Sequence, residues 1–315
     1  MLVAILLVVT AGPRQPLAPL GGSTPDLLSL DSTSIESLKE SLGVKKALDG
    51  LAEIADFLNA VRDPNTSELL RHTIDTLNRQ LEDTSLRSLL EDGVSLLHLA
   101  VVYDHVKAIR VLVAAGADLE VEARFEMDAE MGTLTLTPLQ LAAGMGCTEA
   151  IRALVNAGAD IEAKEASEGF TPLHSASLHG HAASLEALLA LGASHGAQDM
   201  EGDTPLHLAA KTDHTDAIRV LAAAGASLEA RNHAGDTPMH HATRDANLEA
   251  IRALAEAGAS LMAYNSAGET PFSISRTLAL AEHHEEALST PMELMDGNRE
   301  EAVSPWNMLS TSPLL

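Results

Sequence analysis

The stretch Thr204-Pro205-Leu206-His207 returns along this 315-residue chain in the same or a slightly altered form. Its proline stands at positions 138, 172, 205, 238 and 271, in steps of 34, 33, 33 and 33. A second series, Gly-Ala followed by Asp or Ser, keeps the same phase. The other tetrapeptides begin at Thr137, Thr171, Thr237 and Thr270, and the glycines of the second series are Gly116, Gly158, Gly192, Gly225 and Gly258. Two series in phase indicate a repeated structural unit.

Each unit has the pattern of two short helices joined by a turn. The threonine is an N-cap residue, and the proline after it suits the first helical position, where no backbone N–H is needed. We expect the first helix to end near Gly180-His181 and its counterparts. The second helix carries the pattern of residues 217–221, and Gly225 ends it as a C-cap. One unit cannot cover its own aliphatic face, so neighbouring units must stack.

The repeats resemble the ankyrin repeat family over residues 91–288, with about five full units and a divergent sixth. This resemblance implies an all-α solenoid of helix-turn-helix units with β-hairpin fingers. It also implies that the histidine of each Thr-Pro-Leu-His stretch, with His98 in the first unit, bonds locally to the threonine and the backbone. The first unit departs from the pattern, since Ser95-Leu96-Leu97-His98 has no proline.

The first unit is also longer than the others. The step from Gly116 to Gly158 is 42 (158 − 116 = 42), which exceeds the usual step of 33 by nine (42 − 33 = 9). The insertion falls between Asp118 and Thr137. Both flanks of this segment alternate with a period of two and are rich in β-forming residues, and the centre is turn-like. We therefore expect a β-hairpin that extends the finger between units one and two. It carries six acidic residues and one basic residue, Arg124.

The flanking segments predict three further parts of the chain. Residues 1–31 combine an apolar start, long enough for a signal peptide but without a preceding basic residue, with a flexible leader. Residues 32–90 show helical spacing of apolar residues and predict an N-terminal helical cap, or else a partner-binding bundle. Residues 289–315 predict a disordered tail, in which Trp306 is either a docking motif or idle. The lone cysteine, Cys147, fits a cytoplasmic protein, with export as the alternative.

Composition argues against several functional classes. The net charge is −25 (20 basic and 45 acidic residues), which disfavours nucleic acid as a partner. No apolar run reaches the ~20 residues of a transmembrane span. Seven of the 14 histidines stand at two fixed positions of the repeat, and neighbouring histidines on a helix do not face the same way, so we expect neither a metal site nor a cofactor. No phosphate-binding loop or nucleophile motif is present, and we therefore expect a non-enzymatic protein.

Positions that differ between units are the candidate partner contacts. The resemblance implies that partners touch the finger tips and the inner surface of the first helices. Units one to three offer apolar and aromatic residues there, whereas units four and five offer charged ones. The candidate partner-binding residues are Val102, Tyr103, Phe125, Met145, Glu168, Phe170, Leu178, His179, Met200, Glu201, Asp203 and Lys211. Aromatic residues rimmed by charge are typical of interaction hot spots.

This surface has competing interpretations. Phe125 could instead pack within its own hairpin, and Phe170 could cover a neighbouring finger. Residues 91–288 hold 29 acidic and 11 basic residues, a net charge of −18. That charge favours a basic protein partner, or serves only to keep the surface solvated. We expect an interaction module or scaffold, with a regulatory subunit or assembly chaperone that masks a partner site as the alternative.

Overall fold

The computed structural model describes residues 94–126 and 133–282. The expected leader, the N-terminal cap, the centre of the hairpin and the C-terminal tail lie outside these residues. The chain divides into two compact units, Met1–Met200 and Glu201–Leu315.

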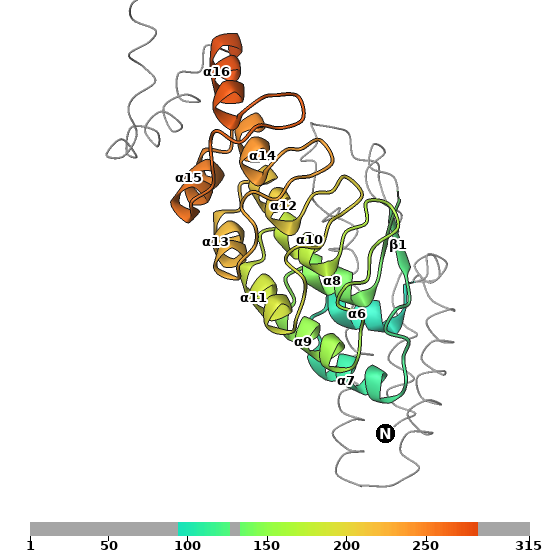
Figure 1. Cartoon of the computed structure of the whole chain (residues 1–315). Coiled ribbons are helices and arrows are strands. Elements are labelled where there is room, and N and C mark those ends of the chain that lie inside the picture. Colours follow the sequence, from blue (N-terminus) through green and yellow to red (C-terminus); the bar gives the residue numbers. More distant parts are fainter. Residues whose placement is uncertain (1–93, 127–132, 283–315) are drawn as a thin grey trace, which may run out of the picture. The chain divides into compact units, whose positions relative to one another are not determined.

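In the first unit, pairs of short helices stack as the repeats predict (Figure 1). The inner helices α6, α8 and α10 pack in that order, and so do the outer helices α7, α9 and α11. Their bounds are α6 Leu96–Val102, α7 Val106–Ala114, α8 Pro138–Gly144, α9 Thr148–Asn156, α10 Pro172–Leu178 and α11 Ala182–Ala190. The all-α solenoid is therefore confirmed in this unit.

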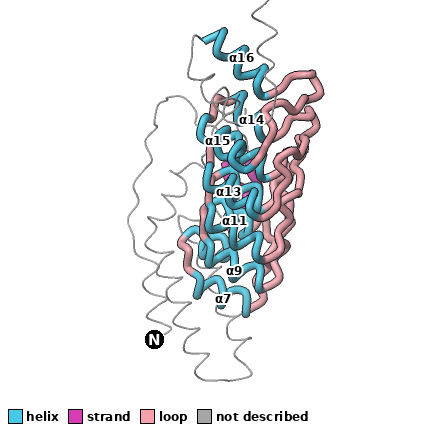
Figure 2. The backbone as a smooth tube through the Cα atoms, turned by 60° about the vertical axis from the view of Figure 1, so that its left-hand side comes forward, coloured by secondary structure: helices cyan, strands magenta, loops and turns pink. Residues whose placement is uncertain are grey.

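The second unit repeats the arrangement. The inner helices α12, α14 and α16 pack in sequence order, and the outer helices α13 and α15 pack against each other. Their bounds are α12 Pro205–Lys211, α13 Thr215–Ala223, α14 Pro238–Arg244, α15 Leu248–Ala257 and α16 Pro271–Glu282. Within each unit the finger loops gather on one side of the helices (Figure 2). Among the described helices, none is long and apolar enough to cross a membrane.

Hydrogen bonds at the helix starts explain why the tetrapeptide recurs. In the second unit, His207 Nδ1 accepts from the backbone N–H of Thr204 at 3.0 Å and lies 2.9 Å from Thr204 Oγ1. The neutral ring then carries its proton on Nε2, which donates to the backbone carbonyl of Asp236 at 3.1 Å. The local bond implied by the resemblance is present, and a second bond ties the histidine to the following finger. In the first unit His98 likewise reaches the carbonyl of Leu136 at 3.0 Å.

The predicted hairpin is also confirmed. Strands β1 (Ala123–Glu126) and β2 (Thr133–Leu136) pair antiparallel, with Ala123 opposite Leu136 and Phe125 opposite Leu134. Ala123 and Leu136 are buried at its base, where β2 leads into α8. The hairpin thus begins on the core of the first unit and extends away from it as a finger.

Candidate partner-binding surface

Three side chains form a row along the inner helices of the first unit. Tyr103, Met145 and His179 are the C-cap residues of α6, α8 and α10, and each is half-buried. Because these helices pack in order, the three residues occupy the same place on successive repeats. Burial raises the pKa of the Tyr103 hydroxyl, which therefore stays protonated and can donate a hydrogen bond. We call these three residues the inner row.

The histidine of the inner row is held in place by two contacts. His179 Nδ1 lies 2.8 Å from the carbonyl oxygen of Ser175, and its ring stacks on that of His181 with the centroids 6.1 Å apart. His181 in turn lies 2.9 Å, through Nε2, from the carbonyl oxygen of Gly144 on the preceding repeat. The row thus has a fixed geometry at its third member, as expected for a preorganised surface.

Three of the sequence-predicted contacts are not available to a partner. Val102, Leu178 and Asp203 are exposed by only 3%, 8% and 1%, so the expectation that they face outward is wrong. The physical reason for the two apolar residues is helical geometry. Adjacent residues on a helix point about 100° apart, so that Val102 and Leu178 face the stack while Tyr103 and His179, the residues after them, project from it. Asp203 is buried in a polar network described below.

The finger residues of the first unit have mixed accessibility. Glu168 is exposed, and Met200 is 58% exposed, with its backbone N–H bonded to the carbonyl of Glu168 at 2.8 Å. The ring of Phe170 is only partly exposed and stacks on that of His174, with the centroids 5.9 Å apart. Phe170 therefore packs mainly on its own repeat. For Phe125 the backbone lies in β1, and its side chain is outside the described part of the structure.

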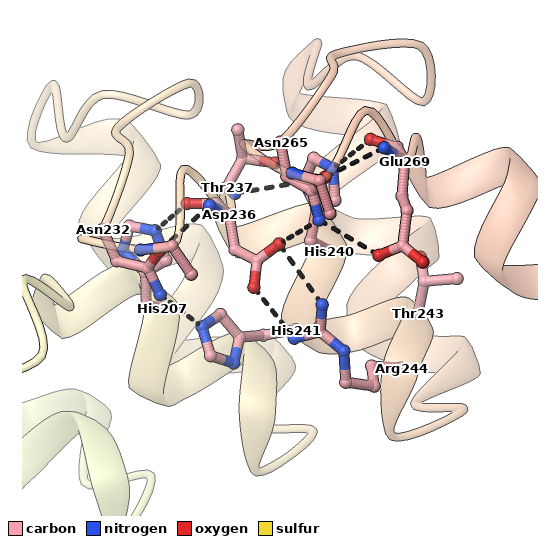
Figure 3. A network of polar contacts seen from close by, with 12 residues as sticks. His207, Asn232, Asp236, Thr237, His240, His241, Thr243, Arg244, Asn265 and Glu269 are labelled. Carbon is pink, nitrogen blue, oxygen red and sulfur yellow. Dashed lines mark hydrogen bonds and ion pairs between the residues drawn. The ribbon is translucent and has the colours of Figure 1, made fainter.

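In the second unit, Glu201 and Lys211 are exposed. The same unit contains a polar network that the sequence analysis did not predict (Figure 3). His241 Nε2 lies 3.2 Å from Asp203 Oδ1, and Asn232 donates to the same oxygen at 2.7 Å. Burial alone would raise the pKa of Asp203. Hydrogen bonds from His241 and Asn232, and the nearby charge of His241 and His207, lower it to about 2.

The network is repeated one unit further along. Arg244 binds Asp236 through two nitrogens, at 2.9 and 3.3 Å, and Asn265 donates to Asp236 Oδ1 at 2.8 Å. Burial would raise the pKa of Asp236, and its bonds to Arg244 and Asn265 lower it. One signal in the sequence could have indicated this. Each aspartate directly precedes a Thr-Pro pair, and each asparagine follows its aspartate at the same spacing (232 − 203 = 29 and 265 − 236 = 29).

Comparison with protein families agrees with this geometry. A model described as Ankyrin repeats (3 copies) matches residues 123–199 and 188–265, and one described as Ankyrin repeat matches residues 92–124. The chain belongs to the ankyrin repeat family. No curated protein matches it. Ankyrin repeat proteins are generally non-catalytic interaction modules, and this one is a module for protein–protein interaction. Among the described residues, no three His, Cys, Asp or Glu side chains are grouped so as to hold a metal ion.

Proposed function

We propose that this ankyrin repeat protein binds a basic protein partner through the inner row of its first unit and the exposed finger residues of the same unit. The observation that carries this proposal is the inner row, in which Tyr103, Met145 and the imidazole of His179 lie half-exposed at the same place on successive repeats. The corresponding residues of the second unit are Thr212 and Asp245, which are polar.

Charge supports the choice of a basic partner. Residues 91–288 carry a net charge of −18, and the exposed finger residue Glu168 of the first unit contributes to it. Complementary charge speeds association and discriminates against acidic partners, and this effect weakens as salt screens it. In this proposal the inner row supplies the contact area, and the negative charge of the protein orients the basic partner.

The test is capture of the partner from the native cell by the full-length protein, followed by affinity measurements on the purified pair. Tyr103→Ala with Met145→Ala is expected to weaken binding at least tenfold, since buried anchors contribute about 1–2 kcal/mol or more each. Asp245→Ala, at the matching place on α14, is the control and should leave affinity unchanged. Equal affinities of the wild type and the double variant would contradict the proposal, provided that both show the same helical signal.

Salt dependence separates the charge argument from the apolar one. For a basic partner, affinity should fall steadily between low and high ionic strength. A salt-independent affinity, or a captured partner with an acidic surface, would contradict the proposal that the partner is basic. Neither result would contradict the inner row as the contact surface. A stable complex of fixed stoichiometry with a single partner would favour a regulatory subunit or assembly chaperone over a scaffold.

We further propose that the protein acts in the cytoplasm. Support comes from its single cysteine, Cys147, which is buried and cannot form an intramolecular disulfide. N-terminal sequencing of the protein from its native cell tests this proposal. A mature chain that begins near Gly12 would instead support export.

A further inference from the structure

The last described finger of the second unit exposes large apolar side chains. Met262 is 49% exposed and Tyr264 is 61% exposed. One repeat earlier the same positions hold Glu229 and Arg231, which bind this finger: Glu229 Oε1 accepts from the N–H of Ser260 at 2.7 Å, and Arg231 donates to the carbonyl of Tyr264 at 2.6 Å. Met262 and Tyr264 therefore occupy the positions from which the preceding finger reaches its neighbour.

The same pair of bonds occurs once in the first unit. There Glu162 accepts from the N–H of Ser194 at 2.7 Å, and Lys164 donates to the carbonyl of Gln198 at 2.7 Å. In these two repeats both positions are charged and bonded to the next finger, whereas the repeat between them has Gly196 and Gln198 there. At Met262 and Tyr264 they are apolar instead, which suits a neighbour that covers them with apolar surface.

The inner helix next to this finger shows the same feature. Phe272 on α16 is partly exposed, whereas Met239, at the same position of α14, is fully buried. α16 packs on α14, and no described element follows α16. We call Met262, Tyr264 and Phe272 the C-terminal end surface.

One proline beyond α16 falls in the phase of the repeats, although the Gly-Ala pair of the other units is absent there. Pro305 follows Pro271 at a step of 34 (305 − 271 = 34), which equals the step from Pro138 to Pro172 (172 − 138 = 34). It stands in Ser304-Pro305-Trp306-Asn307, which places a capping hydroxyl, a proline, a large apolar residue and a polar residue in the order of Thr-Pro-Leu-His. The structure tolerates these changes elsewhere, since Ser95 caps α6 and Gln140 replaces the histidine in α8.

We propose that residues 283–315 are the occupant of the C-terminal end surface. In this arrangement Ser304-Pro305 begins one more inner helix, with Trp306 in the place of Met239 and next to Phe272, and the residues before it lie along Met262 and Tyr264. The chain is long enough. Between Glu282 and Pro305 there are 22 residues (305 − 282 − 1 = 22), against 26 between Lys211 and Pro238 (238 − 211 − 1 = 26), and α16 is 12 residues long where α12 has 7.

The protein contains its own probe, because Trp306 is its only tryptophan. In the full-length protein, selectively excited Trp306 is expected to emit at shorter wavelength than N-acetyltryptophanamide and to be quenched several-fold less by acrylamide. Met262→Ser with Tyr264→Ser should shift the emission toward that of the free compound, because the apolar surface that holds the segment is lost. Both side chains are exposed, so the helical signal should be unchanged.

Met200→Ser is the matched control, since Met200 is an equally exposed finger methionine outside this surface. It should leave the emission of Trp306 unchanged. Three results would overturn the proposal: emission like that of free indole in the isolated protein, a shift that grows with protein concentration and so indicates a second copy, or an equal effect of Met200→Ser. This inference does not depend on the proposed partner of the first unit.

Discussion

The imidazole of His241 lies 3.2 Å from the carboxylate of Asp203, and both side chains are almost fully buried. His241 occupies the position that Leu208 holds one repeat earlier. A histidine that pairs with Asp203 therefore replaces an apolar residue. The ring of His241 also meets that of His207 edge to face, with the centroids 5.5 Å apart. A core feature of the second unit therefore depends on two residues that are far apart in the sequence.

Removing one member of this pair should be costly. His241→Leu leaves the Asp203 carboxylate buried with fewer hydrogen bonds, and we expect a loss of about 2–4 kcal/mol in the free energy of unfolding. His241→Leu with Asp203→Ala should recover part of this loss, since no buried charge remains. Urea unfolding measures both. As a control, Arg252→Ala breaks an exposed pair with Glu249 and should cost at most about 1 kcal/mol. If His241→Leu and Arg252→Ala lower the free energy of unfolding by the same amount, the argument from burial is wrong.

Stability should fall as the solution is acidified below neutral pH. Burial lowers the pKa of His98 and of His207 from 6.5 to about 4. The unfolded histidines take up protons near pH 6.5, whereas the folded ones do not until near pH 4. The stability that each neutral histidine contributes is therefore present above pH 6.5 and lost as the pH falls toward 4, by up to about 3 kcal/mol for each group.

A substitution isolates this effect. In α8, Gln140 makes the same capping bonds as the histidines do elsewhere, so His207→Gln should keep the cap and remove the titrating group. Urea midpoints between pH 7 and pH 4.5 should then vary less for the variant than for the wild type. Identical pH profiles of the variant and the wild type would show that His207 does not cause the loss of stability at low pH.

The turn between α14 and α15 contains a strained residue. Ala246 has a φ of +56°, a conformation that costs a residue with a Cβ atom about 1 kcal/mol. Gly180, in the corresponding turn of the first unit, has no such cost. We expect Ala246→Gly to raise the free energy of unfolding by about 0.5–1 kcal/mol. Thermal or urea unfolding measures it, with Ala224→Gly as the comparison. Ala224 has a φ of −76°, so glycine there should destabilise.

Cys147 should react slowly in the native protein. Its side chain is buried, and its sulfur lies 3.7 Å from the carbonyl oxygen of Val101. Reaction with a thiol reagent requires access to the sulfur, which burial hinders. Modification is expected to be at least tenfold faster in denaturing urea than in buffer. A native rate equal to that of free cysteine would show that the first repeats open readily.

Local signals in the sequence were sufficient for most of the fold. Thr-Pro pairs mark the starts of the inner helices from α8 to α16 because capping and the missing proline N–H act within one turn. The inserted segment and its alternation were sufficient for the hairpin, since strand pairing across a short connection is also local. The local bond between each repeated histidine and its threonine followed from the family resemblance.

These local signals did not predict which side chains are exposed or which polar side chains pair with each other. The repeat period assigns Val102 and Tyr103 to adjacent positions of one unit, yet only the stacking of α6 on α8 determines that the first is buried and the second half-exposed. In the same way, His241 meets Asp203 because α14 packs on α12. Repeat phase and capping are encoded within a few neighbouring residues. The identity of the exposed and paired side chains depends on how successive helices pack, which involves residues a full repeat or more apart in the sequence.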